Sequence, residues 1–370
     1  MVRARRLLGA LATAGLVGVA GAGASGGCNA VLAIPDPTLA RHVTCVDGTC
    51  TCEAGFTDCD SKRGDDCAID LGNDPHHCGA CGRDCQGGGC KGGLCQPLAL
   101  ATLPGARGLS MHGGSLLVGR CGSRGASDAF LEVPAGGGEA VTLVRSSHCA
   151  AAQALAGDAL YWSDTSALMG LQLSAQQQTE PLFVAATSAW KVVASGTHVY
   201  WGLLDAVGNR VGVERLKLAD GVKDKVYPSE VFGLAVGMGG VYWSAADGIH
   251  TLADNAPTST LSIMLTSPRD LAIDATTLYV GAAPGIYALP VDGSTLSLLV
   301  PGANGAHLTT DATTLFWLDD LAGSVNRAPL AGGKPTVLAT GVSFTSASVV
   351  VADATFVYWL AGDVVARIPR

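Results

Sequence analysis

The sequence predicts an all-β protein, a seven-bladed β-propeller (six blades being the alternative) preceded by a small disulfide-rich module. The chain has 370 residues, of which 50 are glycine and only 15% are charged. This composition suits short strands joined by tight turns, because glycine is costly inside helices. Ten cysteines gather between Cys45 and Cys95, and an aromatic pair recurs at intervals of 37–44 residues after them. A disulfide framework and a repeat architecture follow from these two patterns.

The N-terminus, residues 1–27, reads as a signal peptide. Arg3, Arg5 and Arg6 precede an apolar stretch that is too short and too rich in glycine to span a membrane. Residues 28–44 form a short tether. Removing three arginines and no acid changes the net charge from −8 to −11. This acidic balance argues against nucleic acid as a partner, and against the membrane except through a lipid anchor.

Cys28 stands where the signal peptide ends. Ser25-Gly26-Gly27-Cys28 resembles the bacterial lipoprotein box, with Ser25 in place of the usual Leu. The resemblance implies lipid attachment at Cys28 and a location at the outer membrane or cell surface. The alternative is ordinary cleavage after Ala24, which would leave a periplasmic or secreted protein with a free or intermolecularly paired Cys28.

Residues 45–95 have few apolar side chains, so cross-links must replace a hydrophobic core. Twelve cysteines remain when Cys28 is set aside, and an even number in an exported chain predicts disulfides. These are Cys45, Cys50, Cys52, Cys59, Cys67, Cys78, Cys81, Cys85, Cys90, Cys95, Cys121 and Cys149. The stretch from Cys50 to Cys59 resembles the end of an EGF-like module, but it is shorter and the connectivity stays open. Residues 28–95 as a whole resemble the Cys-rich segments of myxobacterial surface lipoproteins, which implies surface display.

Residues 96–370 carry the repeat, in which an apolar strand and a tight turn precede a strand with the aromatic pair. The central residues are Leu117, Tyr161, Tyr200, Tyr242, Tyr279, Phe316 and Tyr358. A tryptophan follows five of them, whereas Val118 and Val280 take its place in the first and fifth copies. A third strand such as 285–290 and a fourth such as 333–338 complete each copy. Four short antiparallel strands per copy are typical of propeller blades.

The last copy has only three predicted strands, 348–351, 356–360 and 363–368. Residues 97–103 supply the missing fourth strand in this interpretation, which removes an exposed sheet edge. Cys121 and Cys149 then fall in loops on one face of neighbouring blades, so we expect a disulfide between them.

Tyr161-Trp162-Ser163-Asp164 resembles the repeat of propellers of the YWTD and NHL type, which implies a receptor-like binding face. The simpler interpretation is that the rings pack between blades. Two metal sites are also considered. His76, His77, Cys78, Cys81 and Cys85 match zinc ligands, but an oxidising compartment favours disulfides. Asp58, Asp60, Asp65 and Asp66 could hold Ca²⁺ through their carboxylate oxygens, but the favoured interpretation is that they are solvated acids of turns. We therefore assign no metal and no cofactor, with calcium an open possibility.

No catalytic residue is assigned. Asp274, Asp311 and Asp353 occupy equivalent places before their central aromatic residues, which indicates turn chemistry. The histidines of the repeat region lie at unrelated repeat positions, namely His112, His148, His198, His250 and His307. The sequence predicts an exported, lipid-anchored surface protein that binds protein or glycan without catalysis. The alternative is an extracytoplasmic propeller hydrolase, a lactonase or glycosidase, with a metal or paired carboxylates at its centre.

Overall fold

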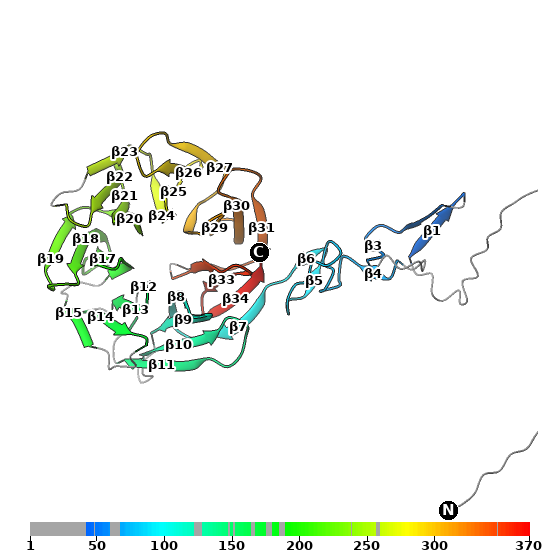
Figure 1. Cartoon of the computed structure of the whole chain (residues 1–370), viewed down its shortest axis with the longest axis horizontal. Helices are drawn as coiled ribbons and strands as arrows, with labels where there is room; N and C mark the ends of the chain where they lie inside the picture. The colour runs from blue at the N-terminus through cyan, green and yellow to red at the C-terminus, as the bar shows by residue number, and fades with distance from the viewer. Residues whose placement is uncertain are drawn as a thin grey trace, which may run out of the picture.

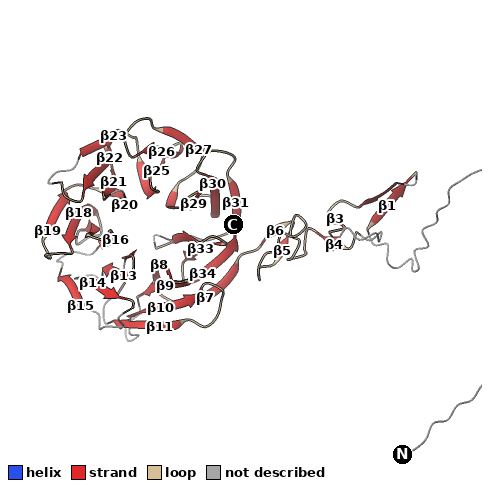
Figure 2. Cartoon of the chain, viewed as in Figure 1, coloured by secondary structure: helices blue, strands red, loops and turns tan. Residues whose placement is uncertain are grey.

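A computed structural model describes most of the chain from residue 42 onward. The described residues are 42–47, 49–59, 67–121, 128–146, 149–150, 152–163, 167–174, 180–184, 189–237, 239–256, 260–345 and 347–370. Their regular secondary structure is all strand (Figure 2). No helix among them could cross a membrane. The predicted signal peptide and Cys28 lie outside the described residues.

Seven four-stranded antiparallel sheets are arranged in a ring (Figure 1). We number the blades 1 to 7 in chain order. The innermost strands are β8 (Ala106–His112), β12 (Ala152–Ala156), β16 (Ala189–Ala194), β20 (Val231–Gly237), β24 (Pro268–Ile273), β28 (Ala306–Thr310) and β32 (Val349–Ala352). The second strands are β9 (Ser115–Arg120), β13 (Ala159–Ser163), β17 (His198–Leu204), β21 (Gly240–Ala245), β25 (Thr277–Ala282), β29 (Thr314–Asp319) and β33 (Phe356–Ala361). The sequence predicts this architecture correctly, and the alternative of six blades is wrong.

The outer half of each blade is formed by two further strands. The third strands are β10 (Asp128–Pro134), β14 (Ala167–Gln172), β18 (Arg210–Lys217), β22 (Gly248–Ala253), β26 (Gly285–Pro290), β30 (Ser324–Pro329) and β34 (Val364–Pro369). The fourth strands are β11 (Val141–Ser146), β15 (Glu180–Val184), β19 (Lys223–Tyr227), β23 (Thr260–Ile263), β27 (Ser297–Pro301), β31 (Thr336–Thr340) and β7 (Leu98–Thr102).

Blade 7 closes the ring with strands from two distant parts of the chain. β7 pairs antiparallel with β34, with Thr102 opposite Val364 and Leu98 opposite Arg367. The predicted closure by residues 97–103 is thereby confirmed. Because β7 precedes blade 1 and β34 belongs to the last copy, no hairpin turn joins these two strands.

The aromatic pairs hold neighbouring blades together. Successive strand residues point to opposite faces of a sheet, so the central residue contacts the next blade and its follower contacts the preceding one. Tyr200 thus shares a core cluster with Trp243 of blade 4, and Tyr279 shares one with Trp317 of blade 6. Tyr358 of blade 7 and Val118 of blade 1 complete the ring in the same way. The packing interpretation of these rings is confirmed, since all five tryptophans of the repeat are buried.

The Cys-rich segment contains three small hairpins. They comprise β1 (Val43–Val46) with β2 (Thr49–Cys52), β3 (Phe56–Thr57) with β4 (Ile69–Asp70), and β5 (Cys90–Lys91) with β6 (Leu94–Cys95). Four disulfides cross-link the segment: Cys52–Cys67, Cys59–Cys81, Cys78–Cys90 and Cys85–Cys95. Cys52 and Cys59 therefore do not bond to each other, and the EGF-like resemblance stays a resemblance. The side chains of Cys45 and Cys50 lie outside the described residues.

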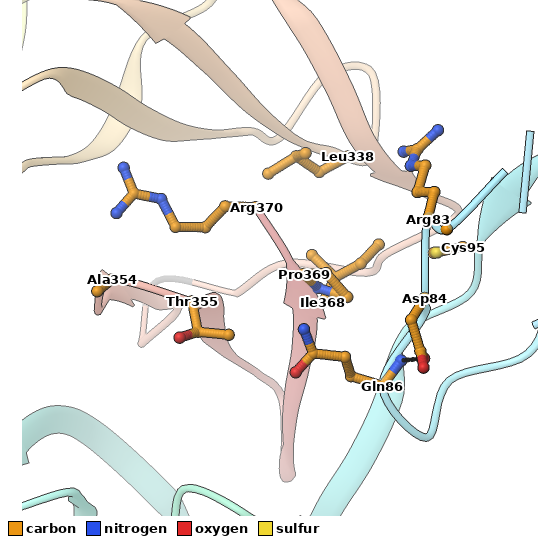
Figure 3. A pocket seen from close by; sticks show the side chains of 11 residues that line it. Arg83, Asp84, Gln86, Cys95, Leu338, Ala354, Thr355, Ile368, Pro369 and Arg370 are labelled. Carbon is orange, nitrogen blue, oxygen red and sulfur yellow. Dashed lines mark hydrogen bonds between the residues drawn. The ribbon is translucent and has the colours of Figure 1, made fainter. Parts of the chain in front are cut away.

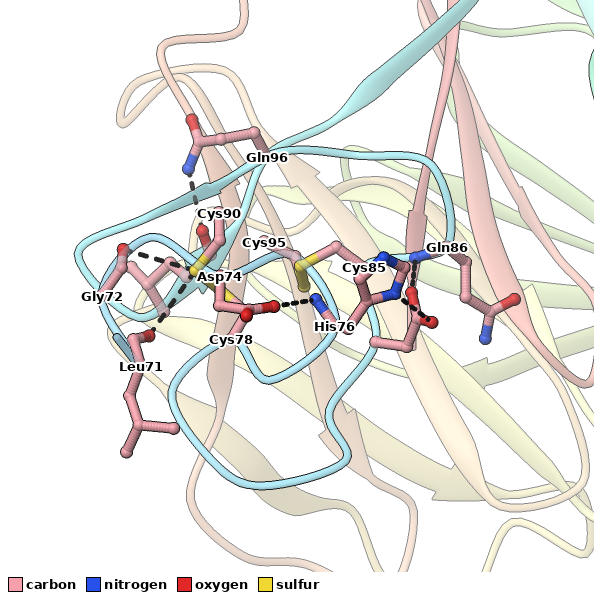
Figure 4. The surroundings of a disulfide bond; sticks show 12 residues. Leu71, Gly72, Asp74, His76, Cys78, Cys85, Gln86, Cys90, Cys95 and Gln96 are labelled. Carbon is pink, nitrogen blue, oxygen red and sulfur yellow. Dashed lines mark hydrogen bonds and ion pairs between the residues drawn. A yellow bond between two sulfur atoms is a disulfide. The ribbon is translucent and has the colours of Figure 1, made fainter. Parts of the chain in front are cut away.

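The last part of this segment packs onto the propeller. Cys78, Cys85 and Cys95 belong to the same buried cluster as Leu338 and Val357 of blades 6 and 7. Figure 4 shows the two disulfides of this region beside the blade strands. A fifth disulfide, Cys121–Cys149, joins blades 1 and 2 with a Cα–Cα distance of 4.7 Å, as the positions of its loops predict.

Candidate binding site at the centre of the propeller

Bulges at the start of the innermost strands build the candidate site. We call the face with the loops between blades the linking face, and the face with the turns between first and second strands the hairpin face. Loop 302–305 lies on the linking face and turn 274–276 on the hairpin face. In blades 1, 3, 4, 5 and 6 the innermost strand shifts register just after the linking loop. A bulge re-aims side chains. The first residues of these innermost strands therefore depart from the regular alternation of side chains between the two faces of the sheet.

Lys191 and Asp270 meet across blade 4. Lys191 lies on β16 of blade 3 and Asp270 on β24 of blade 5, and Lys191 Nζ is 2.6 Å from Asp270 Oδ1. The second carboxylate oxygen accepts a hydrogen bond of 3.0 Å from the backbone N–H of Leu308 in blade 6. Three blades thus converge on one carboxylate near the propeller axis.

The charge states of this group follow from its surroundings. Burial on its own would raise the pKa of Asp270, but the Lys191 ammonium outweighs this effect, and the pKa lies below its usual value. Burial lowers the pKa of His307, which neighbouring Asp270 only partly offsets. At neutral pH the group therefore holds a Lys–Asp ion pair beside a neutral imidazole.

An aromatic and a guanidinium group extend the site toward blade 4. The guanidinium of Arg210 stacks over the Trp190 ring at 4.0 Å from the centroid and donates to the Phe232 carbonyl oxygen at 2.8 Å. Trp190 and Phe232 are both bulge residues and are half-buried. Cation–π stacking of this kind fixes the orientation of both groups.

A polar chain continues the site on the other side. Arg269 donates to the Asn304 side-chain oxygen at 2.6 Å, and the Asn304 amide donates to Asp320. Arg269 and Asn304 are near the linking face of blades 5 and 6. The site as a whole therefore presents fixed charged, amide and aromatic groups from four consecutive blades.

The carboxylate of Asp270 is engaged by donors of the protein itself. Both oxygens of Asp270 already accept hydrogen bonds from protein donors. Because its pKa is lowered, Asp270 is ionised at neutral pH and is not suited to donate a proton. Groups of three His, Cys, Asp or Glu side chains close enough to hold a metal occur, within the described ranges, only in the Cys-rich segment.

The other histidines of the repeat are dispersed. His112 pairs with Asp158 at 2.9 Å, and buried His198 lies 3.7 Å from Asp254. His250 pairs with Asp247 at 2.8 Å and stacks on the Trp243 ring. His148 and Asp164 lie outside the described residues. None of the three described pairs joins the group around Asp270.

The repeated aspartates have the turn role that their positions predict. Asp274 Oδ1 accepts from the N–H groups of Thr276 and Thr277 at 2.7 and 2.8 Å, and its other oxygen accepts from the Tyr279 hydroxyl at 2.8 Å. Asp353 and Tyr358 repeat this geometry. These acids stabilise hairpin turns, as Asx turns do elsewhere.

The residues of the zinc alternative are engaged otherwise. Cys78, Cys81 and Cys85 each belong to a disulfide. His76 pairs with Asp84 at 3.0 Å, and His77 accepts a hydrogen bond from the Gly82 N–H. For calcium, Asp58 is exposed, whereas Asp60, Asp65 and Asp66 lie outside the described residues.

Sequence reasoning missed Lys191, Asp270 and Arg210, and it noted His307 without a partner. Lys191 and Asp270 are separated by 79 positions. The bulges that aim these residues at each other leave no repeating residue type in the sequence. The only available signal was the charge of Lys191 and Asp270 inside otherwise apolar strands.

Comparisons with known proteins detect similarity in the fold. No protein-family model matches the chain, and no curated protein matches it by sequence. A computationally designed protein, Ika8, aligns with a TM-score of 0.53 and 14% identity, over 72% of this chain and 83% of its own. The WD40 propeller domain of Doa1 aligns with a TM-score of 0.53 and 12% identity, over 74% of this chain and 96% of its own.

A chain of a nidogen/laminin complex aligns less closely, with a TM-score of 0.44 and 16% identity, over 63% of this chain and 92% of its own. At these identities the matches with the designed protein and Doa1 show the fold and nothing more. The chain is a seven-bladed β-propeller.

Proposed function

We propose that this protein is an exported surface protein that uses its propeller as a non-catalytic module for binding a protein or a glycan. The ligand binds on the linking face, over the group formed by Lys191, Asp270 and Arg210. The observation that carries the proposal is the convergence of side chains from blades 3 to 6 on the propeller axis, held by the 2.6 Å ion pair between Lys191 and Asp270.

The composition of this group supports recognition. Binding sites combine apolar or aromatic surface with a few polar groups that fix the orientation of the ligand. Here the half-buried Trp190 and Phe232 supply the aromatic surface, while Arg210 and Arg269 supply donors. Arg269 lies in the bulge of β24 and Arg210 at the start of β18. Strands rather than long loops therefore place these donors, so the site is rigid before a ligand arrives.

The proposals of export and lipid anchoring rest on evidence separate from that for the ligand site. Five described disulfides, including the bond between blades 1 and 2, are typical of proteins outside the cytosol. Together with the signal-peptide pattern, they support export. The resemblance of residues 25–28 to the lipoprotein box supports lipid attachment at Cys28 and display at the outer membrane or cell surface. The Cys-rich segment would then stand between the lipid and the propeller.

The binding proposal is tested with arrays of purified glycans and candidate surface proteins. Lys191→Met and Arg210→Met should each weaken binding by about tenfold or more, because each removes a charged donor. Lys334→Met is the matched control, since Lys334 is exposed on the hairpin face and lies far along the chain from the site. Binding that neither variant weakens would contradict the site. Turnover of a lactone or glycoside that Asp270→Asn abolishes would replace the proposal with the hydrolase alternative.

The anchoring proposal has its own test. Wild-type protein should incorporate labelled fatty acid and partition with membranes, and Cys28→Ser should do neither. A Cys28→Ser protein that stays in the membrane fraction would show that the lipid is not the anchor. Neither result bears on the ligand site.

A further inference from the structure

Three blades carry an arginine on the third strand, opposite the central aromatic residue of the second. Arg215 is opposite Tyr200, Arg327 is opposite Phe316, and Arg367 is opposite Tyr358. Equivalent positions on equivalent sheets lead to the expectation that these three side chains make equivalent contacts. Two of them do so.

Arg215 and Arg367 each donate to the next blade around the ring. Arg215 donates to the carbonyl oxygens of Asp254 and Ala256, which lie in the turn between the third and fourth strands of blade 4. Arg367 donates to the carbonyl oxygen of Ala135, in the corresponding turn of blade 1. The turn between the third and fourth strands is thus the acceptor for such an arginine.

Arg327 cannot make this contact, because blade 7 has no such turn. The third strand of blade 7, β34, and its fourth strand, β7, come from distant parts of the chain. Arg327 has no hydrogen bond or ion pair to any described residue and is half-buried. Burial lowers its pKa, and the nearby Arg370 and Arg83 lower it further. An unpaired guanidinium next to two like charges is the reverse of the usual arrangement.

A cleft of about 380 Å³ takes the place of the missing turn. Arg83, Asp84 and Gln86 of the Cys-rich segment form one wall, and Thr355 and Arg370 of blade 7 form the other (Figure 3). The apolar surface of the cleft comes from Leu338, Ile368 and Pro369. The backbone of Gln86 is tied to the propeller, since its carbonyl oxygen accepts from Arg367 at 3.1 Å.

The acids near the cleft are already paired. Asp84 pairs with His76 at 3.0 Å and accepts from the Gln86 N–H at 2.6 Å. Asp311 pairs with Arg370, at 2.5 Å from Nη2 to Oδ2. The guanidinium groups of Arg83 and Arg327 have no carboxylate partner among the described residues. The local charge is therefore positive in a chain whose net charge is negative.

We propose that the cleft between the Cys-rich segment and blades 6 and 7 is a binding site for a small molecule with a carboxylate or similar oxyanion group. Arg83, which lines the cleft, holds the oxyanion, because a planar guanidinium group matches its geometry. Arg327 does not line the cleft, but it lies near Arg83 and Arg370 and adds to the positive charge there. Leu338 and Ile368 contact the apolar part of the ligand. This site is separate from the proposed ligand site on the linking face, and its test does not depend on that proposal.

The test measures binding of glucuronate, glucose and inorganic sulfate to the full mature protein by calorimetry, with ionic strength held constant by NaCl. Glucuronate should bind and its neutral counterpart glucose should not. Binding of sulfate as well would show that the oxyanion suffices, and binding of glucuronate alone would show that the organic part contributes. Absence of binding by both anions up to tens of millimolar would overturn the proposal.

Substitutions of arginine test whether glucuronate binds in the cleft. Arg83→Gln should weaken glucuronate binding by about tenfold or more, because it removes a charged donor of the cleft. Arg327→Gln should weaken binding less, because it removes only a positive charge near the cleft. Arg145→Gln on the exposed strand β11 removes the same charge elsewhere and should change nothing. Equal weakening by Arg145→Gln would assign the effect to net charge and overturn the site. Arg83 is exposed, so Arg83→Gln decides the test even if Arg327→Gln does not fold.

Discussion

Lys191 Nζ lies 2.6 Å from Asp270 Oδ1, and this ion pair joins blades 3 and 5 past the blade between them. Most contacts of the ring connect neighbouring blades through buried apolar residues. The Lys191–Asp270 contact is of another kind, because two charges from non-neighbouring blades share one place near the axis. Removing two charges from water costs free energy. The net contribution of the pair to stability therefore depends on whether its remaining donors and acceptors are hydrogen-bonded.

Lys191→Met should destabilise the protein by about 1–3 kcal/mol at neutral pH, since it leaves the Asp270 carboxylate without its cation. The folded-state pKa of Asp270 lies below its usual value in the wild type. Its stabilisation is therefore present above the unfolded-state pKa and is lost as the pH falls through the folded-state value. The difference in unfolding free energy between wild type and variant should shrink as the pH falls below about 4. Chemical denaturation at several pH values measures it.

Adding Asp270→Asn to Lys191→Met provides the control. The double variant should recover part of the lost stability, because no unpaired charge is left. Equal and additive losses from the two substitutions would show that Lys191 and Asp270 are not coupled.

Tyr279→Phe should destabilise the propeller by about 1–2 kcal/mol, because the Asp274 carboxylate loses the hydroxyl donor at 2.8 Å. Burial and the hydrogen bond to Asp274 both raise the pKa of Tyr279. Tyr242→Phe is the matched control, since no described residue makes a hydrogen bond with the Tyr242 hydroxyl. Thermal unfolding should separate the two variants, and identical melting temperatures would contradict the assigned role of Asp274.

Replacing Cys121 and Cys149 together by Ser should lower the unfolding free energy by about 2–4 kcal/mol. The bond closes a loop between residues 28 positions apart and thereby constrains the unfolded chain. Guanidinium titration of both proteins measures the loss. The reverse result, a double variant as stable as the wild type, would mean that the bond does not constrain the unfolded state.

Gly233→Ala should destabilise the ring by about 1–3 kcal/mol. A Cβ at Gly233 would collide with the Arg269 carbonyl oxygen on the neighbouring innermost strand, so β20 and β24 could not approach as closely. Gly196→Ala is the control, because open space surrounds a Cβ at that turn position. Gly196→Ala should leave the melting temperature unchanged or raise it slightly. Equal losses in both variants would contradict the packing argument.

The sequence alone predicted seven blades and the closure of the ring, because both depend on local patterns, and the structure excluded the alternative of six blades. Each aromatic pair lies within one strand, and alternation along that strand directs Tyr200 to one neighbour and Trp201 to the other. The apolar segment 97–103 precedes the first copy, and it could be assigned to the incomplete last copy for the same reason. Local pattern also indicated the turn role of Asp274 and its equivalents.

The tertiary structure alone decided which charged residues meet. Bulges in the innermost strands bring Lys191 to Asp270, and such a change of register depends on how closely neighbouring strands approach once the ring is closed. The sequence likewise could not show that Arg327 lacks a hydrogen-bond partner among the described residues, because Arg327 occupies the same repeat position as Arg215 and Arg367. Its partner is missing only because the chain closes the ring with strands from two distant segments, which leaves a cleft where the other blades have a turn.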